Sequence, residues 1–308
     1  MFGVTILGNN SALPAFDRHP TAQVVTLNDH IFLIDCGEGT QMQIARYKIK
    51  RSRINHIFIS HLHGDHYFGL IGLITSMGLL GRETDLHLYA PKGLDNIIAL
   101  QLEVAATSLP CKLHFHPLEK EGIIVDHHKF QVECFATQHR IPCWGFIVRE
   151  KKVPRKIDKE KVLQYEIPTA YYESLKVGRD YETKDGKIIK NEWVTFANTP
   201  ARNYAFCADT IFDEDLVHKV KNVQLLYHET TYLKDLYERA AMRFHSTTIQ
   251  AATIASKANA QKLLIGHFSS KYEELHSFLD ETKEVFANTE LAIEGVTFRV
   301  PHTTLNHK

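Results

Sequence analysis

The chain has 308 residues, of which 44% are hydrophobic, enough for one large domain or two ordinary ones with a substantial core. Its 36 Lys and Arg balance 36 Asp and Glu, which excludes a uniformly basic, histone-like binder but leaves local basic patches open. Five scattered cysteines without a Cys-x-x-Cys pair, an N-terminus unlike a signal peptide and the lack of a membrane-length apolar run predict a soluble cytoplasmic protein.

The first quarter of the chain alternates strand-like and helix-like segments. β-Branched and aromatic runs mark the strands, and the last helix is so apolar that we expect it to be buried. The predicted elements are a strand at 2–7, a hairpin at 23–34 that turns at Asn28-Asp29, a helix at 41–47, a strand at 55–60 and a helix at 67–81.

A dense group of potential metal ligands follows the strand at 55–60. His61 and His63 alternate along an extended chain and so point the same way, while Asp65 and His66 follow Gly64 and can turn towards a second position. Imidazole and carboxylate suit zinc and similar ions. One loop could thus serve two metal ions. The competing interpretation is a set of surface polar residues in a protein with 19 histidines.

The middle of the chain is predicted to hold four strands, at 86–90, 112–116, 123–136 and 145–149, and a helix at 94–104. The strand at 123–136 leads to His139. Residues 151–190 then carry 11 Lys and Arg against 7 Asp and Glu. With short helices expected at 158–165 and 169–176, this segment is predicted to be an insertion that projects from the core. An ordinary solvated surface segment is the alternative.

The last third repeats the pattern of a hydrophobic strand followed by a polar residue. A strand at 204–208 leads to Asp209, one at 225–227 to His228 and Glu229, and one at 262–265 to His267. The remaining predicted elements are a helix at 249–258 capped by Ser246 or Thr247, an amphipathic helix at 272–286 and a strand at 297–300.

These strand ends supply the donors that the first group lacks. Strands of one sheet that finish at the same edge would bring His139, Asp209 and His267 to the loop after 55–60. One assignment gives His61, His63 and His139 to one metal and Asp65, His66 and His267 to the other, with Asp209 bridging. Positions left open for water are the mark of a catalytic rather than a structural site.

The motif Ser60-His-Leu-His-Gly-Asp-His66 resembles the signature of the metallo-β-lactamase superfamily. Further segments along the whole chain are similar to its ribonuclease Z branch, which matures the 3′ end of transfer RNA. They are Ile6-Leu-Gly8 with Ser11-Ala-Leu-Pro14, Asp35-Cys-Gly-Glu-Gly-Thr-Gln41, Ala208-Asp-Thr210, Tyr227-His-Glu-Thr-Thr-Tyr232, Phe244-His-Ser-Thr247 and Gly266-His-Phe-Ser-Ser-Lys-Tyr272.

The resemblance implies an α/β fold, a four-layer αββα sandwich over residues 1–308 that carries an inserted RNA-gripping arm at 151–190. It implies two zinc ions per chain, with manganese or another divalent ion as alternatives, held by the seven donors above. Asp65 would orient or deprotonate the attacking water, and His245, helped by Glu229, would protonate the leaving oxygen. Precursor transfer RNA would be the substrate, a homodimer the assembly, and a 3′-hydroxyl and 5′-phosphate the new ends.

The sequence departs from the family pattern at two places. The Gly-Pro element usual in the arm is replaced by Ile167-Pro168, and the loop usually written Gly-Thr-Gly is Gly8-Asn9-Asn10. Both concern the handling of substrate rather than hydrolysis. Three alternatives stay open: a small-molecule phosphodiesterase or lactonase of the same superfamily, a non-catalytic RNA-binding protein, and an iron-dependent redox enzyme.

Overall fold

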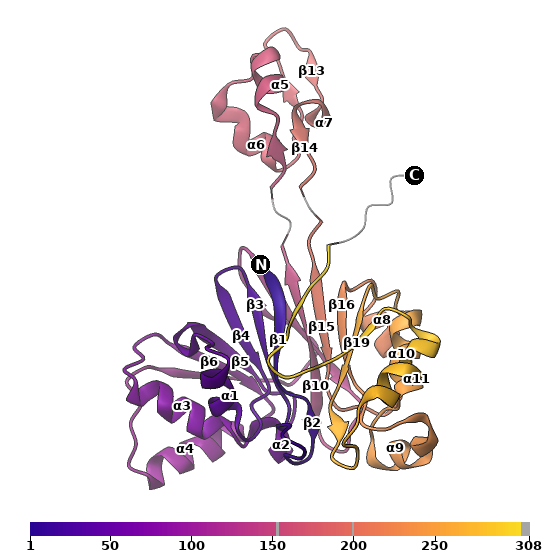
Figure 1. Cartoon of the computed structure of the whole chain (residues 1–308). Helices are drawn as coiled ribbons and strands as arrows, with labels where there is room; N and C mark the ends of the chain where they lie inside the picture. The colour runs from indigo at the N-terminus through magenta and orange to yellow at the C-terminus, as the bar shows by residue number, and fades with distance from the viewer. Residues whose placement is uncertain (152–153, 199, 303–308) are drawn as a thin grey trace.

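Two seven-stranded sheets lie face to face at the centre of the computed structural model, and helices cover their outer faces (Figure 1). The structure describes residues 1–151, 154–198 and 200–302. Within these ranges no helix has both the length and the apolar character needed to cross a bilayer.

The first sheet has the strand order β20-β1-β3-β4-β5-β6-β7. Its first four strands pair antiparallel, whereas β4, β5, β6 and β7 run parallel, so the last strands end at one edge. The strands are β1 (Phe2–Gly8), β3 (Ala22–Leu27), β4 (His30–Ile34), β5 (Ile54–Phe58), β6 (Leu86–Ala90), β7 (Leu113–Pro117) and β20 (Thr297–Arg299).

The second sheet has the order β19-β17-β16-β15-β10-β9-β8. Antiparallel strands from β8 to β15 are followed by the parallel set β15, β16, β17 and β19. The strands are β8 (Gly122–Asp126), β9 (Phe130–Thr137), β10 (Cys143–Glu150), β15 (Asn203–Cys207), β16 (Leu225–Glu229), β17 (Leu263–Gly266) and β19 (Thr289–Leu291).

Helices flank each sheet, and a small parallel pair, β2 (Asn10–Ser11) with β18 (Phe268–Ser269), ties the two halves together. The helices over the first sheet are α1 (Thr40–Arg46), α2 (Gly64–Tyr67), α3 (Leu70–Leu79) and α4 (Leu94–Val104), after the short η1 (Arg51–Arg53). Those of the second half are α8 (Leu216–Lys219), η3 (Lys234–Leu236), α9 (Tyr237–Arg243), α10 (Thr248–Lys257) and α11 (His276–Val285).

Alternation along the strands separates the apolar layers. In β10, Phe146 and Val148 belong to the cluster between the sheets, whereas Ile147 belongs to the cluster under α8, α10 and α11. A third cluster joins the first sheet to α1, α3 and α4. Three apolar layers between four structural layers confirm the predicted αββα sandwich. All five cysteines are buried free thiols.

A small unit with its own core projects from one end of the sandwich, between β10 and β15 (Figure 1). Its core holds Val162, Ile167, Leu175, Ile189 and Val194. Its elements are β11 (Lys156–Ile157), α5 (Lys159–Gln164), η2 (Thr169–Tyr171), α6 (Tyr172–Lys176), β12 (Tyr181–Glu182), β13 (Ile188–Ile189), α7 (Asn191–Val194) and β14 (Thr195–Phe196). Because β11 pairs with β14, the unit continues beyond the predicted boundary at 190.

Two elements that were predicted to be continuous are each divided into two in the structure. The strand at 123–136 is the hairpin β8–β9, because the polar run 127–129 turns the chain and the His127 N–H donates to the Phe130 carbonyl at 2.9 Å. The helix at 67–81 is split between α2 and α3, and Phe68, Leu79 and Leu80, which were expected to be buried, are exposed. The helix predicted at 272–286 begins later, at His276.

Candidate metal centre

The seven predicted donors meet at the end of the sandwich opposite the projecting unit. They come from both sheets, whereas we expected from the sequence that the strands of one sheet would bring them together. Those that follow β5 belong to the first sheet, and His139, Asp209 and His267 follow β9, β15 and β17 of the second. The Trp144 N–H donates to the Ser60 carbonyl at 3.0 Å, which fastens the start of β10 to the end of β5 at this edge.

The first cluster contains His61, His63, His139 and Asp209, whose ligand atoms all lie within 4.8 Å of one another. His63 Nδ1 lies 2.9 Å from His61 Nε2 and 3.2 Å from His139 Nε2. Asp209 Oδ2 lies 3.6 Å from His61 Nε2 and 3.8 Å from His139 Nε2. Four donors therefore converge on one point.

The second cluster contains Asp65, His66 and His267, and Asp209 faces it with its other oxygen. Asp65 Oδ2 lies 3.5 Å from both His66 Nε2 and His267 Nε2. Asp209 Oδ1 lies 3.5 Å from His66 Nε2 and 3.3 Å from His267 Nε2. Ligand atoms around a tetrahedral ion with bonds of about 2.0–2.1 Å stand about 3.3 Å apart, so this spacing suits such an ion.

Three buried polar atoms at the second cluster have no hydrogen-bond partner in the part of the chain that the structure describes. They are His66 Nε2, His267 Nε2 and Asp209 Oδ1, on residues exposed by 1%, 2% and 3%. A buried polar group without a partner is destabilising by about 1–3 kcal/mol. A divalent cation would satisfy all three atoms at once, so the residues present fit a metal ion.

The charge balance of the centre also favours a cation. Burial raises the pKa of the Asp209 carboxyl, but the surrounding histidines outweigh it and hold that pKa well below its usual range. Burial lowers the pKa of His66, yet Asp209, Asp65 and Asp35 together raise it well above 6.5. A proton on His66 therefore occupies the place that a metal ion would take.

Hydrogen bonds behind the donors fix their orientation. The His66 Nδ1–H donates to Asp35 Oδ2 at 2.7 Å, and the Ser60 N–H donates to Asp35 Oδ1 at 2.8 Å. The Thr231 hydroxyl lies 3.0 Å from His267 Nδ1, and the His139 Nδ1–H donates to the Phe244 carbonyl at 2.9 Å. The three contacts at Nδ1 leave Nε2 of His66, His267 and His139 facing the cluster. Asp35 and Thr231 were not predicted to have a role, although Asp35 also directly follows a strand.

Strained backbone accompanies these contacts. Asp35, Phe244 and His267 adopt φ values of 57°, 58° and 61°, in the left-handed region that non-glycine residues rarely occupy. All three either bind a donor side chain or carry one. Such strain persists where the surrounding structure over-determines the conformation, and it concentrates at functional sites.

A second charged pair, Glu229 and His245, lies beside the clusters. The His245 Nδ1–H donates to Glu229 Oε1 at 3.0 Å, and Glu229 also accepts hydrogen bonds from the backbone N–H groups of Thr231 and Ser246. Burial lowers the pKa of His245, but the Glu229 carboxylate outweighs it and raises that pKa to about 9. His245 is therefore a cation at neutral pH.

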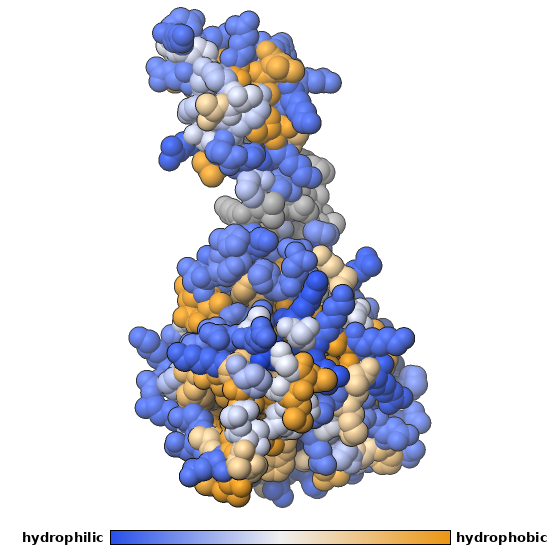
Figure 2. All heavy atoms as spheres, turned by 90° about the vertical axis from the view of Figure 1, so that its left-hand side faces the viewer, coloured by the Kyte–Doolittle hydropathy of each residue, from blue (hydrophilic) through white to orange (hydrophobic). Residues whose placement is uncertain are grey.

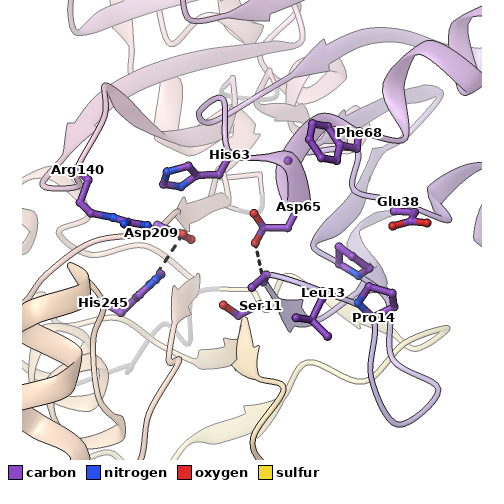
Figure 3. Close-up of a pocket in the computed structure, with 13 residues that line it drawn as sticks. Ser11, Leu13, Pro14, Glu38, His63, Asp65, Phe68, Arg140, Asp209 and His245 are labelled. Carbon is purple, nitrogen blue, oxygen red and sulfur yellow. Dashed lines mark hydrogen bonds and ion pairs between the residues drawn. The ribbon is translucent and has the colours of Figure 1, made fainter.

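The centre opens into a cavity of about 400 Å³. His63, Asp65, Asp209 and His245 line it, together with Arg140 and Phe68 (Figure 3). All nine residues predicted for the site thus lie at or directly behind one cavity. Arg140 and Phe68 were not predicted to belong there. Nothing in the local sequence distinguishes Arg140 from a surface residue, and Phe68 was expected to be buried in its helix.

Comparison with known proteins gives the family. Residues 2–175, more than half of the chain, match the family model described as "Anti-Pycsar protein Apyc1", which places this part of the chain in that family. Ribonuclease Z of Bacteroides thetaiotaomicron is 43% identical over 305 residues, which cover 98% of this chain and 96% of the relative. Ribonuclease Z of Porphyromonas gingivalis is 41% identical over 295 residues, 95% of this chain and 97% of the relative.

Solved structures agree. Human tRNase Z, short form, superposes with a TM-score of 0.70 and 27% identity, over 97% of this chain and 99% of that one. The metallo-β-lactamase fold protein YhfI of Bacillus subtilis superposes with a TM-score of 0.68 at 17% identity, over 96% of this chain and 98% of that one, which concerns the fold alone. With 43% identity along nearly the whole of both chains, this chain belongs to the ribonuclease Z family and has the metallo-β-lactamase fold.

Proposed function

We propose that this chain is a metal-dependent endoribonuclease that removes the 3′ trailer from precursor transfer RNA. One observation carries the proposal: two donor clusters share Asp209, and the Glu229–His245 pair lies beside them at the same cavity. This arrangement combines sites for two cations with a separate proton donor, which is what phosphodiester hydrolysis requires. The full-length relatives named Ribonuclease Z support the RNA substrate.

The proposed cofactor is two zinc ions per chain. His61, His63 and His139 would hold one, Asp65, His66 and His267 the other, and Asp209 would bridge them. Five imidazoles and two carboxylates suit zinc, and manganese remains the alternative. When bound, such ions supply Lewis acidity towards phosphate oxygens and water.

Asp65 is proposed to orient the attacking water. Its Oδ2 accepts the Ala12 N–H at 2.8 Å, which holds the carboxylate at the cavity wall. Burial raises the pKa of Asp65, but His66 and His267 outweigh it and keep that pKa well below its usual range. The group is therefore an anion that accepts a hydrogen bond from water and directs one lone pair of the water at phosphorus.

His245 is proposed to protonate the leaving ribose oxygen. Its Nδ1 is held by Glu229, which leaves Nε2 as the nitrogen that can donate into the cavity. Proton transfer from Nε2 as the bond from phosphorus to the 3′ oxygen breaks leaves a 3′-hydroxyl on the transfer RNA and a 5′-phosphate on the trailer.

The projecting unit is proposed to be an arm that binds the transfer RNA away from the cleavage site. It leaves the sandwich at the end opposite the metal centre, and its surface mixes hydrophilic side chains with exposed apolar ones (Figures 1 and 2). Trp193 and Phe196 are 48% and 58% exposed. Lysines and arginines that attract phosphates, beside exposed aromatic rings, suit an RNA surface.

The proposal includes a homodimer in the cytoplasm. Large apolar side chains are exposed on α3 and α4, including Leu79 at 88% and Val104 at 80%, on the side of the molecule that Figure 2 presents. An exposed apolar face of this kind is typical of an interface. The five free thiols suit a reducing compartment.

The test is a cleavage assay on a transfer RNA precursor with a 3′ trailer. The metal-loaded protein should cut at the trailer junction, and Asp65→Ala and His245→Ala should each lower the rate at least a hundredfold. An Asp65→Ala variant as active as the parent would refute the mechanism. Parallel assays with an aryl phosphodiester and metal analysis separate the alternatives, since a small-molecule phosphodiesterase would cleave only the former and a redox enzyme would contain iron.

A further inference from the structure

Arg140 stands in the cavity without a role in the reaction described above. It directly follows His139 in the loop between β9 and β10, and Figure 3 shows its guanidinium directed into the cavity towards Asp209 and His245. It is the one lysine or arginine that lines this cavity among the described residues.

The guanidinium makes no hydrogen bond or ion pair within the described ranges. Three carboxylates, Glu38, Asp65 and Asp209, line the same cavity, yet none lies within 4.0 Å of a nitrogen of Arg140. The protein therefore leaves this cation unneutralised beside its metal centre. An arginine in that state is suited to an anion that enters from outside.

The backbone around Arg140 is fixed on both sides. The Ile211 N–H donates to the Gln138 carbonyl at 2.9 Å, and the Gln138 N–H donates to the Thr210 hydroxyl at 3.2 Å. On the other side, the Trp144 N–H is bonded to the Ser60 carbonyl at 3.0 Å. Because the loop is held between the two sheets, the backbone of Arg140 is fixed, and its exposed side chain extends from there to the cavity.

We propose that Arg140 binds a non-bridging oxygen of the scissile phosphate. This inference rests on the phosphodiesterase function proposed above. The planar fork of a guanidinium matches phosphate oxygens, and charge on those oxygens is stabilised in the transition state. In the reaction, the bond from water oxygen to phosphorus forms while the water passes one proton to Asp65. The bond from phosphorus to the 3′ oxygen breaks, that oxygen takes the His245 proton, and Arg140 keeps its own protons throughout.

The proposal predicts an effect on any phosphodiester, because every such substrate contains the scissile phosphate. Arg140→Ala should lower kcat/KM on the order of a hundredfold for both the precursor transfer RNA and an aryl phosphodiester. Arg140→Lys should be intermediate, since it keeps the charge and loses the fork. Added guanidinium ion should partly restore Arg140→Ala. Arg53→Ala, an exposed arginine at the opposite end of β5, is the matched control.

Two measurements besides turnover complete the test. Metal content should stay that of the parent, because Arg140 belongs to neither donor cluster, and inorganic phosphate should bind the metal-loaded variant at least tenfold more weakly. Unchanged turnover on both substrates, loss confined to the RNA, or loss of metal would each overturn the proposal. A parent that cleaves the aryl phosphodiester in an Arg140-dependent way but leaves the RNA intact would refute the RNA substrate and sustain the role of Arg140.

Discussion

Asp35 is a buried carboxylate that orients a predicted metal ligand without being a ligand itself. It accepts hydrogen bonds from the Ser60 backbone N–H, the Ser60 hydroxyl and His66 Nδ1, and its own backbone has a positive φ of 57°. These contacts fix both the ring orientation and the tautomer of His66. A carboxylate in this position also raises the basicity of the donor nitrogen.

Asp35→Asn should therefore weaken the second metal site without unfolding the protein. Asparagine tolerates the left-handed backbone, but it carries no charge and cannot accept from all three donors. We expect zinc affinity to fall about 10–100-fold, as measured by competition with a chromogenic chelator. Asp29→Asn, an exposed position in the turn of the same hairpin, is the control. Equal affinity in the two variants would show that Asp35 acts only on folding.

For single residues, the sequence predicted a place in the site where the residue directly follows a strand. His139, Asp209 and His267 could be predicted because the preceding hydrophobic run revealed where each strand ends. Thr231 and Arg140 could not, because their roles depend on side chains that are distant in sequence. No local sequence pattern predicts that the Thr231 hydroxyl lies 3.0 Å from His267 Nδ1.

The break between α2 and α3 places two donors of the second cluster. The Gly69 N–H donates to the Cys36 carbonyl at 2.9 Å, and a Cβ on Gly69 would lie 2.1 Å from the Gly37 carbonyl oxygen. A continuous helix would separate this turn from the loop after β4. The apolar pattern of 67–81 predicted helix correctly but could not reveal a backbone contact that only glycine permits.

Gly69→Ala should push the loop at Gly37 away and displace Asp65 and His66. Because the clash is with backbone, relief requires a shift of the chain, and we expect a loss of at least about 2 kcal/mol in unfolding free energy with weaker metal binding. Gly72→Ala, one turn later in α3, would meet only the tip of Gln41 at 3.2 Å and should be near neutral. Urea unfolding of both variants is the measurement, and similar stability would refute the steric explanation.

A row of histidines crosses the first sheet. The His56 ring stacks on His87 with centroids 5.2 Å apart, and His87 lies 5.3 Å from His116. Burial, followed by repulsion from His87 and other histidines, lowers the pKa of His56 to about 4 from 6.5. Between these two pKa values, His56 is neutral in the folded protein and protonated in the unfolded chain.

The free energy of unfolding should fall as pH drops from 6.5 towards 4, because over that window His56 is protonated in the unfolded chain before it is protonated in the folded protein. The contribution of neutral His56 to stability should be fully present above pH 6.5. At pH 5 the contribution of His56 should be a loss on the order of 2 kcal/mol. His56→Phe, which keeps a ring beside Phe58 and Tyr89, should reduce the difference in unfolding free energy between pH 7 and pH 5 in metal-free protein. An unchanged difference would contradict this origin.

In the whole molecule, the projecting unit and the metal centre lie at opposite ends of the sandwich. β10, of eight residues, spans the distance between them, about 26 Å at 3.3 Å per residue. The chain leaves and returns at neighbouring positions, because the Glu150 N–H donates to the Arg202 carbonyl at 2.9 Å. We therefore expect that the unit can be removed without disturbing the sheet.

Joining Glu150 to Arg202 through Asn-Gly should close β10 and β15 as a hairpin. We expect cleavage of precursor transfer RNA to fall at least a hundredfold and hydrolysis of an aryl phosphodiester to stay within twofold, as measured by kcat/KM. Equal loss of both activities would show that the unit supports the fold rather than the substrate.

The sandwich itself was predicted from resemblance rather than from pattern. Strand periodicity identifies most strands, but it does not say that those of the two halves form separate sheets, which depends on contacts such as Phe58 against Phe146. For the same reason, charge composition predicted where the inserted unit begins better than where it ends, since the pairing of β11 with β14 is not visible in composition.

The division of the donors between the two halves has a consequence for synthesis. The first four are translated before residue 70, but His267 comes 41 residues before the end of the chain. A nascent chain that lacks it cannot complete the second cluster, however well its first sheet has formed. A product truncated before His267 therefore lacks one donor of the second cluster, and we expect it not to cut RNA.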